Sequence, residues 1–180
     1  MQLTLMKKTG LGAMAVLLLL SCIRETDAPA SSNVHPGDSW PVFSSVVPGG
    51  APIGNDSLKG KTALLVFFST DCADCRRELP VVEAVWEELK NDPRFIIVPI
   101  GRKQSAATIA AYWAERDWNM PFYSDPDGSI YALFATRTVP YFFAGTPDGI
   151  VRWVKAGTCD KEACELIGLL KSMAIAAEEY

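Results

Sequence analysis

The chain has little of what several classes of protein require. It contains one histidine, His35, so a histidine-based catalytic or metal centre has almost nothing to use. Its 17 basic side chains are outnumbered by 21 acidic ones and form no basic stripe, which argues against nucleic acid as a partner. The apolar stretch Leu11–Leu20 is roughly half as long as a membrane-spanning helix needs to be. The chemistry must therefore be sought mainly in the five cysteines, and we expect neither a metal nor a cofactor.

The first 21 residues have the composition of a targeting segment. Lys7 and Lys8 supply positive charge ahead of the apolar stretch Leu11–Leu20, and a small polar residue follows it. Residues 1–21 are therefore expected to be a signal peptide, and its removal leaves 15 basic and 21 acidic side chains. A signal peptide directs a protein to a compartment in which disulfides persist, so we expect a periplasmic or cell-envelope location.

The end of this segment, Leu19-Leu20-Ser21-Cys22, resembles a bacterial lipobox. The resemblance implies that Cys22 is lipidated, becomes the first mature residue and anchors the protein to a membrane. The alternative is an ordinary secretory signal with an incidental cysteine. Residues 22–36 carry Ser, Ala, Pro and mixed charge without an apolar period, which predicts a flexible tether ahead of a domain at 37–180.

Apolar runs and helical patterns alternate along the domain, which predicts an α/β fold. Strands separated by helices favour parallel pairing with helices on both faces, and Thr146-Pro147-Asp148-Gly149 signals a hairpin that adds an antiparallel edge. Residues 40–47 are expected to form an added edge strand or hairpin. The prediction is a three-layer sandwich around a mixed sheet. Its strands are expected at 62–69, 95–100, 120–124, 141–144 and 150–154, and its helices at 72–90, 104–117, 129–135 and 160–177.

The most informative motif is Cys72-Ala73-Asp74-Cys75, which directly follows the strand predicted at 62–69 and begins a helix. Two cysteines with this spacing at a helix start can alternate between a dithiol and a disulfide. Cys72 is nearest the loop and should be the more exposed, whereas Cys75 lies one turn into the helix. A purely structural disulfide is the alternative, although such bonds usually close longer loops.

Together with this motif, several other residues make the chain resemble the thioredoxin-like family, and within it the TlpA/ResA-type secreted thiol–disulfide oxidoreductases. The resemblance spans about residues 37–178, and any one of its features alone would be weak. The family's usual Trp and Pro are replaced by Asp71 and Asp74, which leaves the redox potential and the partner surface open. The residues that carry the resemblance are the strand 62–69, Cys72-Ala73-Asp74-Cys75, Glu78, Pro80, Asp125-Pro126-Asp127-Gly128 and Thr138-Val139-Pro140.

The resemblance implies roles for four residues of this chain. Cys72 would be the nucleophile and Cys75 the resolving thiol, and Pro140 would be a cis-proline facing the pair. Glu78 stands where ResA-type relatives carry a functional glutamate, which could move protons for the buried thiol. The alternative for Glu78 is a surface glutamate on a helix.

The predicted partners are proteins that carry disulfides. Pro140 has no N–H to donate and leaves Val139 extended, so that the backbone of Val139, next to Thr138, can pair with a substrate strand. Asp71 and Asp74 do not favour a very stable thiolate at Cys72, and we therefore favour reduction or isomerisation of disulfides over oxidation. By resemblance the electrons come from a membrane thiol carrier. The protein is expected to be a monomer.

Cys159 and Cys164 form a second pair whose role the sequence leaves open. Within one helix their Cα atoms would lie about 8–9 Å apart, too far for a disulfide. If Thr158 or Asp160 caps the helix, Cys159 lies in the loop and can fold back toward Cys164. A structural disulfide, two free thiols, a second redox pair and a metal site shared with His35 are the alternatives.

Two other functions compete with thiol–disulfide exchange. Peroxiredoxins resemble this architecture and carry a Pro-x-x-x-Thr/Ser-x-x-Cys run, of which Ser69 is present while Leu65 occupies the proline position. A metal-binding lipoprotein could hold copper or zinc through Cys72 and Cys75, because soft thiolates suit these ions. The absence of a well-placed His or Met counts against the metal site.

Overall fold

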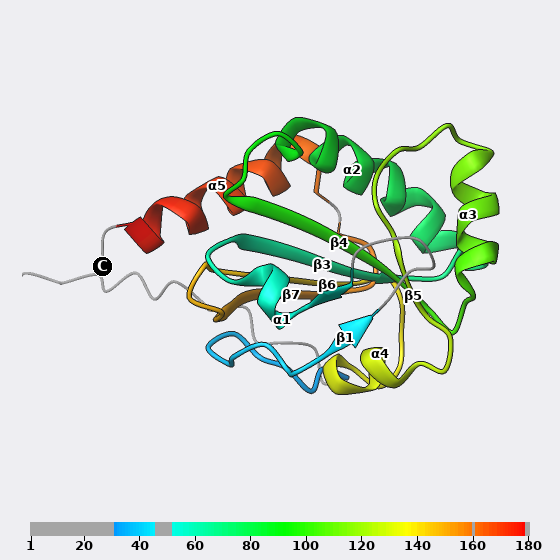
Figure 1. The fold of residues 1–180 in the computed structure, drawn as a ribbon, viewed down its shortest axis with the longest axis horizontal. Coiled ribbons are helices and arrows are strands. Elements are labelled where there is room, and N and C mark those ends of the chain that lie inside the picture. The colour runs from blue at the N-terminus through cyan, green and yellow to red at the C-terminus, as the bar shows by residue number, and fades with distance from the viewer. Residues whose placement is uncertain (1–30, 46–51, 160, 179–180) are drawn as a thin grey trace, which may run out of the picture.

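A five-stranded sheet forms the centre of the protein in the computed structural model, which describes residues 31–45, 52–159 and 161–178 (Figure 1). The strand order is β5-β4-β3-β6-β7. Strands β3, β4 and β5 are parallel, whereas β6 runs antiparallel to both β3 and β7. The predicted mixed sheet and its antiparallel hairpin are therefore confirmed. The strands are β3 (Thr62–Phe68), β4 (Phe95–Arg102), β5 (Tyr123–Asp125), β6 (Tyr141–Gly145) and β7 (Val151–Ala156).

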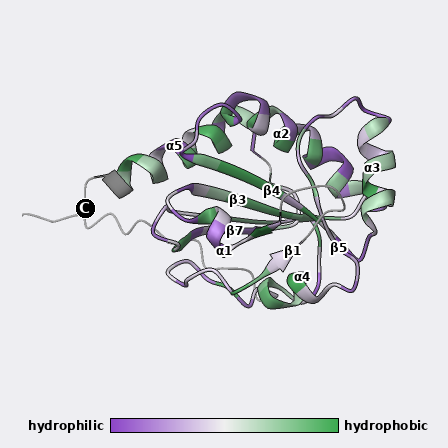
Figure 2. Cartoon of the chain, in the orientation of Figure 1, coloured by the Kyte–Doolittle hydropathy of each residue, from purple (hydrophilic) through white to green (hydrophobic). Residues whose placement is uncertain are grey.

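The central strand β3 is buried along its whole length because both faces of the sheet are covered. On one face, the alternate residues Leu64, Val66 and Phe68 pack with α2 (Ala73–Leu89), α3 (Ala106–Ala114) and α5 (Ala163–Glu178). On the other face, Leu65 and Phe67 pack with α4 (Ser129–Phe134) and α1 (Asn55–Leu58). Figure 2 shows the central strands coloured hydrophobic along most of their length, whereas α2 carries both colours. The period of two along β3 thus builds both halves of the core.

The boundaries differ from the sequence prediction mainly at helix ends. Helix α3 begins at Ala106, because the Ser105 hydroxyl accepts a hydrogen bond from Thr108 N–H and caps the helix. It ends at Ala114, before Asp117 takes a positive φ of 54°. The predicted edge element near 40–47 is a short antiparallel pair, β1 (Ser44–Ser45) with β2 (Ile53–Gly54), separate from the main sheet. The one-turn α1 has no counterpart among the predicted elements.

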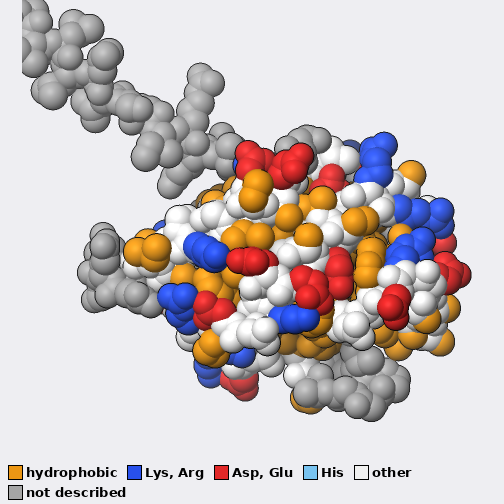
Figure 3. All heavy atoms as spheres, turned by 90° about the horizontal axis from the view of Figure 1, so that it is seen from above, with side chains coloured by type: hydrophobic (Ala, Val, Ile, Leu, Met, Phe, Trp, Pro, Cys, Tyr) orange, Lys and Arg blue, Asp and Glu red, His pale blue; other side chains and the backbone are white. Residues whose placement is uncertain are grey.

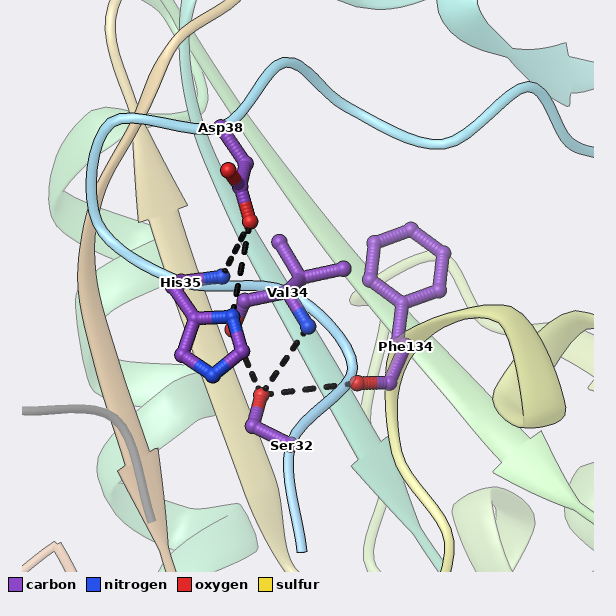
Figure 4. Close-up of polar contacts among 5 residues, drawn as sticks. All are labelled: Ser32, Val34, His35, Asp38 and Phe134. Atoms are coloured by element: carbon purple, nitrogen blue, oxygen red, sulfur yellow. Dashed lines mark hydrogen bonds and ion pairs between the residues drawn. The ribbon is translucent and has the colours of Figure 1, made fainter. Parts of the chain in front are cut away.

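The structured part of the chain extends further toward the N-terminus than the predicted tether allows. Residues 31–36 lie on the domain, where Asn33 N–H donates to Phe134 O at 2.8 Å and the Val34 side chain is buried. Figure 4 shows the Ser32 hydroxyl between Val34 and Phe134, and the turn closed by Asp38. Val34 is buried in the half of the core that contains α4, so residues 31–36 belong to the domain although most of them are polar. The predicted signal peptide, the proposed lipidation site Cys22 and the rest of the tether lie outside the described residues.

The face of the molecule seen from above carries both signs of charge. Figure 3 shows acidic and basic side chains interspersed with apolar ones on the face seen from above. Within the described residues, no helix is long and apolar enough to cross a membrane.

Candidate active site

The turn between β3 and α2 carries Cys72 at the edge of the domain. Cys72 is the N-cap residue of α2 with an extended backbone, and its N–H donates to Ser69 O at 3.1 Å. The side chain of Cys72 is partly exposed. The unpaired N–H groups and the dipole at a helix start favour a negatively charged sulfur at this position. The strand-to-helix junction therefore presents one reachable thiol, as the sequence predicts.

Cys75 lies one turn into the helix and is fully buried. Its Sγ accepts a hydrogen bond from Ser69 N–H at 3.4 Å. Burial raises the pKa of the Cys75 thiol well above its ordinary value, the Ser69 N–H lowers it, and Cys72 raises it further, first through a hydrogen bond and then through its charge. The two thiols of the motif are thus unequal, one accessible and one held in its protonated form.

The segment that precedes β6 lies against Cys72. The Cys72 thiol donates to Val139 O at 3.4 Å, and the peptide bond between Val139 and Pro140 is cis. Thr138 is exposed, Val139 is partly exposed and Pro140 is buried. The Tyr131 hydroxyl donates to Thr138 O and ties this segment to α4. The structure therefore places Cys72 beside the segment Thr138-Val139-Pro140, for which the sequence predicts substrate binding and the facing proline.

Glu78 is buried, with 8% of its surface exposed, and is not the surface glutamate that the sequence left as an alternative. It follows Cys75 by three residues, so the two side chains share one face of α2. The same region contains Cys159, which is 4% exposed in the loop before α5. Burial first, and then the Glu78 charge, raise the pKa of Cys159 to about 11. The helix that carries the dithiol thus also carries a buried carboxyl group, which is electrostatically coupled to a third thiol.

The aspartates that flank Cys72 are each engaged by a neighbour. Asp74 forms an exposed ion pair with Arg77, one turn along α2. Asp71 accepts a long hydrogen bond of 3.5 Å from the amide of Gln104. The Asp74 charge contributes to the raised pKa of Cys75, behind the effect of burial. The charge of the two aspartates beside Cys72 is therefore partly compensated.

Sequence reasoning missed Gln104, which lies in the loop between β4 and α3. Its amide oxygen accepts from Thr70 N–H at 2.9 Å, and its amide nitrogen donates to the Thr70 hydroxyl at 2.7 Å. A signal for this contact exists in the sequence: Gln104 follows the second predicted strand as Thr70 follows the first. Neighbouring parallel strands end at the same edge of a sheet, so the two loops can be expected to meet.

All four described cysteines are free thiols in this structure. Cys159 is buried ahead of α5 and Cys164 is exposed in the first turn of that helix, without a bond between them. A disulfide between them stays a prediction. His35, on the N-terminal segment, lies 3.5 Å from the carboxylate of Asp38. No group of three or more histidine, cysteine or acidic residues among the described residues could hold a metal ion.

Comparisons with known proteins agree with this geometry. The AhpC/TSA family matches residues 36–154. The chain is 26% identical over 161 residues to the soluble secreted antigen MPT53 of Mycobacterium tuberculosis, a match that covers 89% of this chain and 88% of that protein. It is 25% identical over 148 residues to the thiol–disulfide oxidoreductase ResA of Bacillus subtilis, covering 79% and 82%.

A solved structure shares the fold. The thiol:disulfide interchange protein of the thioredoxin family from Chlorobium tepidum superposes with a TM-score of 0.66 at 23% identity, over 76% of this chain and 96% of that one. The predicted thioredoxin-like sandwich is confirmed by this match.

Proposed function

The chain belongs to the AhpC/TSA family, with relatives of the TlpA/ResA type, and from this premise we propose that it is an enzyme that exchanges thiols and disulfides with other proteins outside the cytoplasm. The observation that carries the proposal is the inequality of the two thiols at the start of α2. Cys72 is accessible beside Val139, whereas Cys75 is buried with a raised pKa.

In the first step, the Cys72 thiolate attacks one sulfur of a substrate disulfide. A bond forms between Cys72 and that sulfur, and the second substrate sulfur leaves as a thiolate that takes a proton from water. A substrate strand can lie along Thr138 and Val139, where backbone hydrogen bonds hold it without demanding a particular sequence. The partner's chemistry is thus an accessible disulfide in an extended segment.

In the second step, Cys75 attacks the sulfur of Cys72 and releases the first substrate sulfur. The pair ends as a disulfide and the substrate as a dithiol, so two electrons have moved to the substrate. Because burial raises the pKa of Cys75, its proton must be removed before it can attack. Glu78, buried one turn further along the same helix face, is the base that we assign to this proton.

We assign the enzyme to reduction or isomerisation of disulfides, with the oxidised pair returned to the dithiol by a membrane thiol carrier. Asp71 and Asp74 support this direction because negative charge near Cys72 does not favour the very stable thiolate of a strong oxidant. We further propose that Cys22 carries a lipid that tethers the domain to a membrane of the cell envelope. The similarity to the secreted antigen MPT53 supports a location outside the cytoplasm.

The proposal is tested by reduction of insulin disulfides with glutathione as the electron source. Cys72→Ser is expected to reduce the rate at least about 100-fold, because serine is a far weaker nucleophile than a thiolate. Cys164→Ser, which changes an exposed thiol outside the motif, is the matched control and should keep the parental rate. Parental activity in Cys72→Ser would overturn the proposal, and rapid consumption of hydrogen peroxide through Cys72 would favour a peroxidase instead.

A further inference from the structure

One buried side chain joins the loops that follow two neighbouring strands. Gln104 follows β4, and Thr70 follows β3, at the edge of the sheet where α2 begins (Figure 1). The two residues are 34 positions apart in the sequence, yet they share two hydrogen bonds of 2.9 and 2.7 Å. Gln104 is 7% exposed and Thr70 is 4% exposed. Buried polar groups of this kind are kept only where they are bonded, because leaving them unpaired is costly.

The two hydrogen bonds fix the orientation of the Gln104 amide. Its oxygen faces the Thr70 N–H, which can only donate, so the nitrogen faces the Thr70 hydroxyl. The second N–H of the amide points to the Asp71 carboxylate at 3.5 Å. Gln104 thus contacts Thr70 and Asp71, the two residues directly before Cys72.

The backbone around Gln104 is itself constrained on both sides. Lys103 has a φ of 55°, a left-handed conformation that is uncommon for a residue other than glycine, and its N–H donates to Asp125 O at 2.7 Å. Ser105 caps α3 through Thr108 N–H at 3.1 Å. Sparsely populated backbone conformations persist where the surroundings hold them, and they concentrate at functional sites. Gln104 is therefore presented from a rigid support.

The turn that Gln104 binds is held from its other side by α2. The Arg76 side chain donates to Thr70 O at 2.6 Å, and Cys72 N–H donates to Ser69 O at 3.1 Å. With the Gln104 contacts, the N–H, carbonyl and hydroxyl groups of Thr70 are all bonded. Arg76 belongs to the same helix as the motif, whereas Gln104 supplies the connection to the neighbouring strand.

We propose that Gln104 is a positioning residue for Cys72: it holds the Thr70–Asp71 turn against the β4–α3 loop and so keeps the Cys72 sulfur opposite Val139. This inference rests on the proposed thiol–disulfide exchange and adds a residue to it. Attack on a disulfide needs the sulfur in line with the bond that breaks, and misplacing a reacting group by an ångström is costly in rate. The side chain acts through the turn, and it does not touch the reacting atoms.

The test measures the second-order rate constant of Cys72 with a small aromatic disulfide, in the full chain carrying Cys164→Ser. Gln104→Ala is expected to lower this rate about tenfold. It should also change the equilibrium constant with glutathione about tenfold, which is about 30 mV in midpoint potential. Asn55→Ala is the matched control, because the Asn55 amide also makes two hydrogen bonds between segments, from Phe43 N–H and to Pro41 O, but lies in α1 on the face of the sheet opposite α2. Its rate should stay within about twofold of the parent.

A second variant guards against misfolding of the first. Gln104→Asn keeps the amide but is one methylene shorter, so it should show the same loss of rate while preserving the polarity of the site. In a Thr70→Val background, Gln104→Ala should cause a smaller further loss, because a shared contact makes the effects non-additive. Parental rates and potential in Gln104→Asn or Gln104→Ala would overturn the inference. If the Gln104 variants lose Cys72 reactivity about tenfold while the parent protein cannot reduce insulin, the positioning role of Gln104 stands and the proposed function is rejected.

Discussion

The protein contains two cysteine pairs that look alike in exposure and differ in setting. In each pair one thiol is buried and the other reachable: Cys75 with Cys72, and Cys159 with Cys164. Cys72 is the N-cap residue of α2 and has the Val139 carbonyl beside it, whereas Cys164 lies inside the first turn of α5. Cys159 instead lies ahead of α5, where its thiol feels the charge of Glu78. The comparison teaches that chemistry at a cysteine is decided by the backbone around it more than by the presence of a second thiol.

Glu78 raises the pKa of Cys159 and is the base that we propose for Cys75, so its loss should have the largest effect. Glu78→Gln keeps the shape of the side chain but removes the base assigned to Cys75. We expect the resolving step to slow about 100-fold at pH 7, because a positioned general base typically contributes this much or more. Rapid quench of the reaction with a disulfide peptide measures the step as the decay of the mixed disulfide.

Glu87→Gln is the control for this prediction, because Glu87 is exposed on the same helix and does not approach Cys75. It should leave the decay unchanged. If Glu78→Gln resolves as fast as the parent over the whole range from pH 6 to 9, Glu78 is not the base.

The pH dependence of stability should separate Cys159 from Cys164. The folded protein raises the pKa of Cys159 from about 9 to about 11, so the folded state holds this proton more tightly than the unfolded chain does. The resulting stabilisation is complete below about pH 9 and is lost as the pH rises toward 11, a loss of about 2 kcal/mol. The groups that act on the Cys159 thiol are Glu78 of α2, which raises its pKa, and Lys155 and Lys161, which lower it.

Urea unfolding in reducing buffer at several pH values measures this loss. Cys159→Ala should flatten the profile between pH 9 and 11, whereas Cys164→Ala should follow the parent. Cys75 contributes a loss of the same sign, so some decline remains in Cys159→Ala. Identical profiles for the parent and Cys159→Ala would show that the Cys159 thiol is not held in its protonated form by the fold.

The smallest effect concerns packing. Cys159→Ala at pH 7 removes a buried sulfur from the core shared by α2 and α5, and we expect a loss of about 1–2 kcal/mol in the free energy of unfolding. Cys164→Ala changes an exposed side chain and should stay within about 0.5 kcal/mol of the parent. Equal losses in the two variants would mean that the pairs do not differ as described, for example because a disulfide joins Cys159 to Cys164.

The sequence predicted the sheet well because its signals are local. The buried run 62–69 and the turn Thr146-Pro147-Asp148-Gly149 each determine a nearby element, and the motif at 72–75 identified the start of α2. Contacts between distant segments were harder. The burial of Glu78 depends on what covers that face of α2, and the packing of Val34 depends on α4. The sequence neighbours of Glu78 and Val34 do not determine either burial. The contact between Gln104 and Thr70 could be predicted only once the order of the strands in the sheet was known.

The most direct test of the account is to trap the mixed disulfide at Cys72. Cys75→Ser should accumulate a covalent complex with a protein disulfide substrate, because attack by Cys72 continues while resolution cannot. Mass spectrometry of the digested complex should find the substrate cysteine bonded to Cys72 and to neither Cys159 nor Cys164. A complex that forms through another cysteine, or a Cys75→Ser protein that forms none under conditions where the parent is active, would contradict the assignment of Cys72 as the attacking thiol.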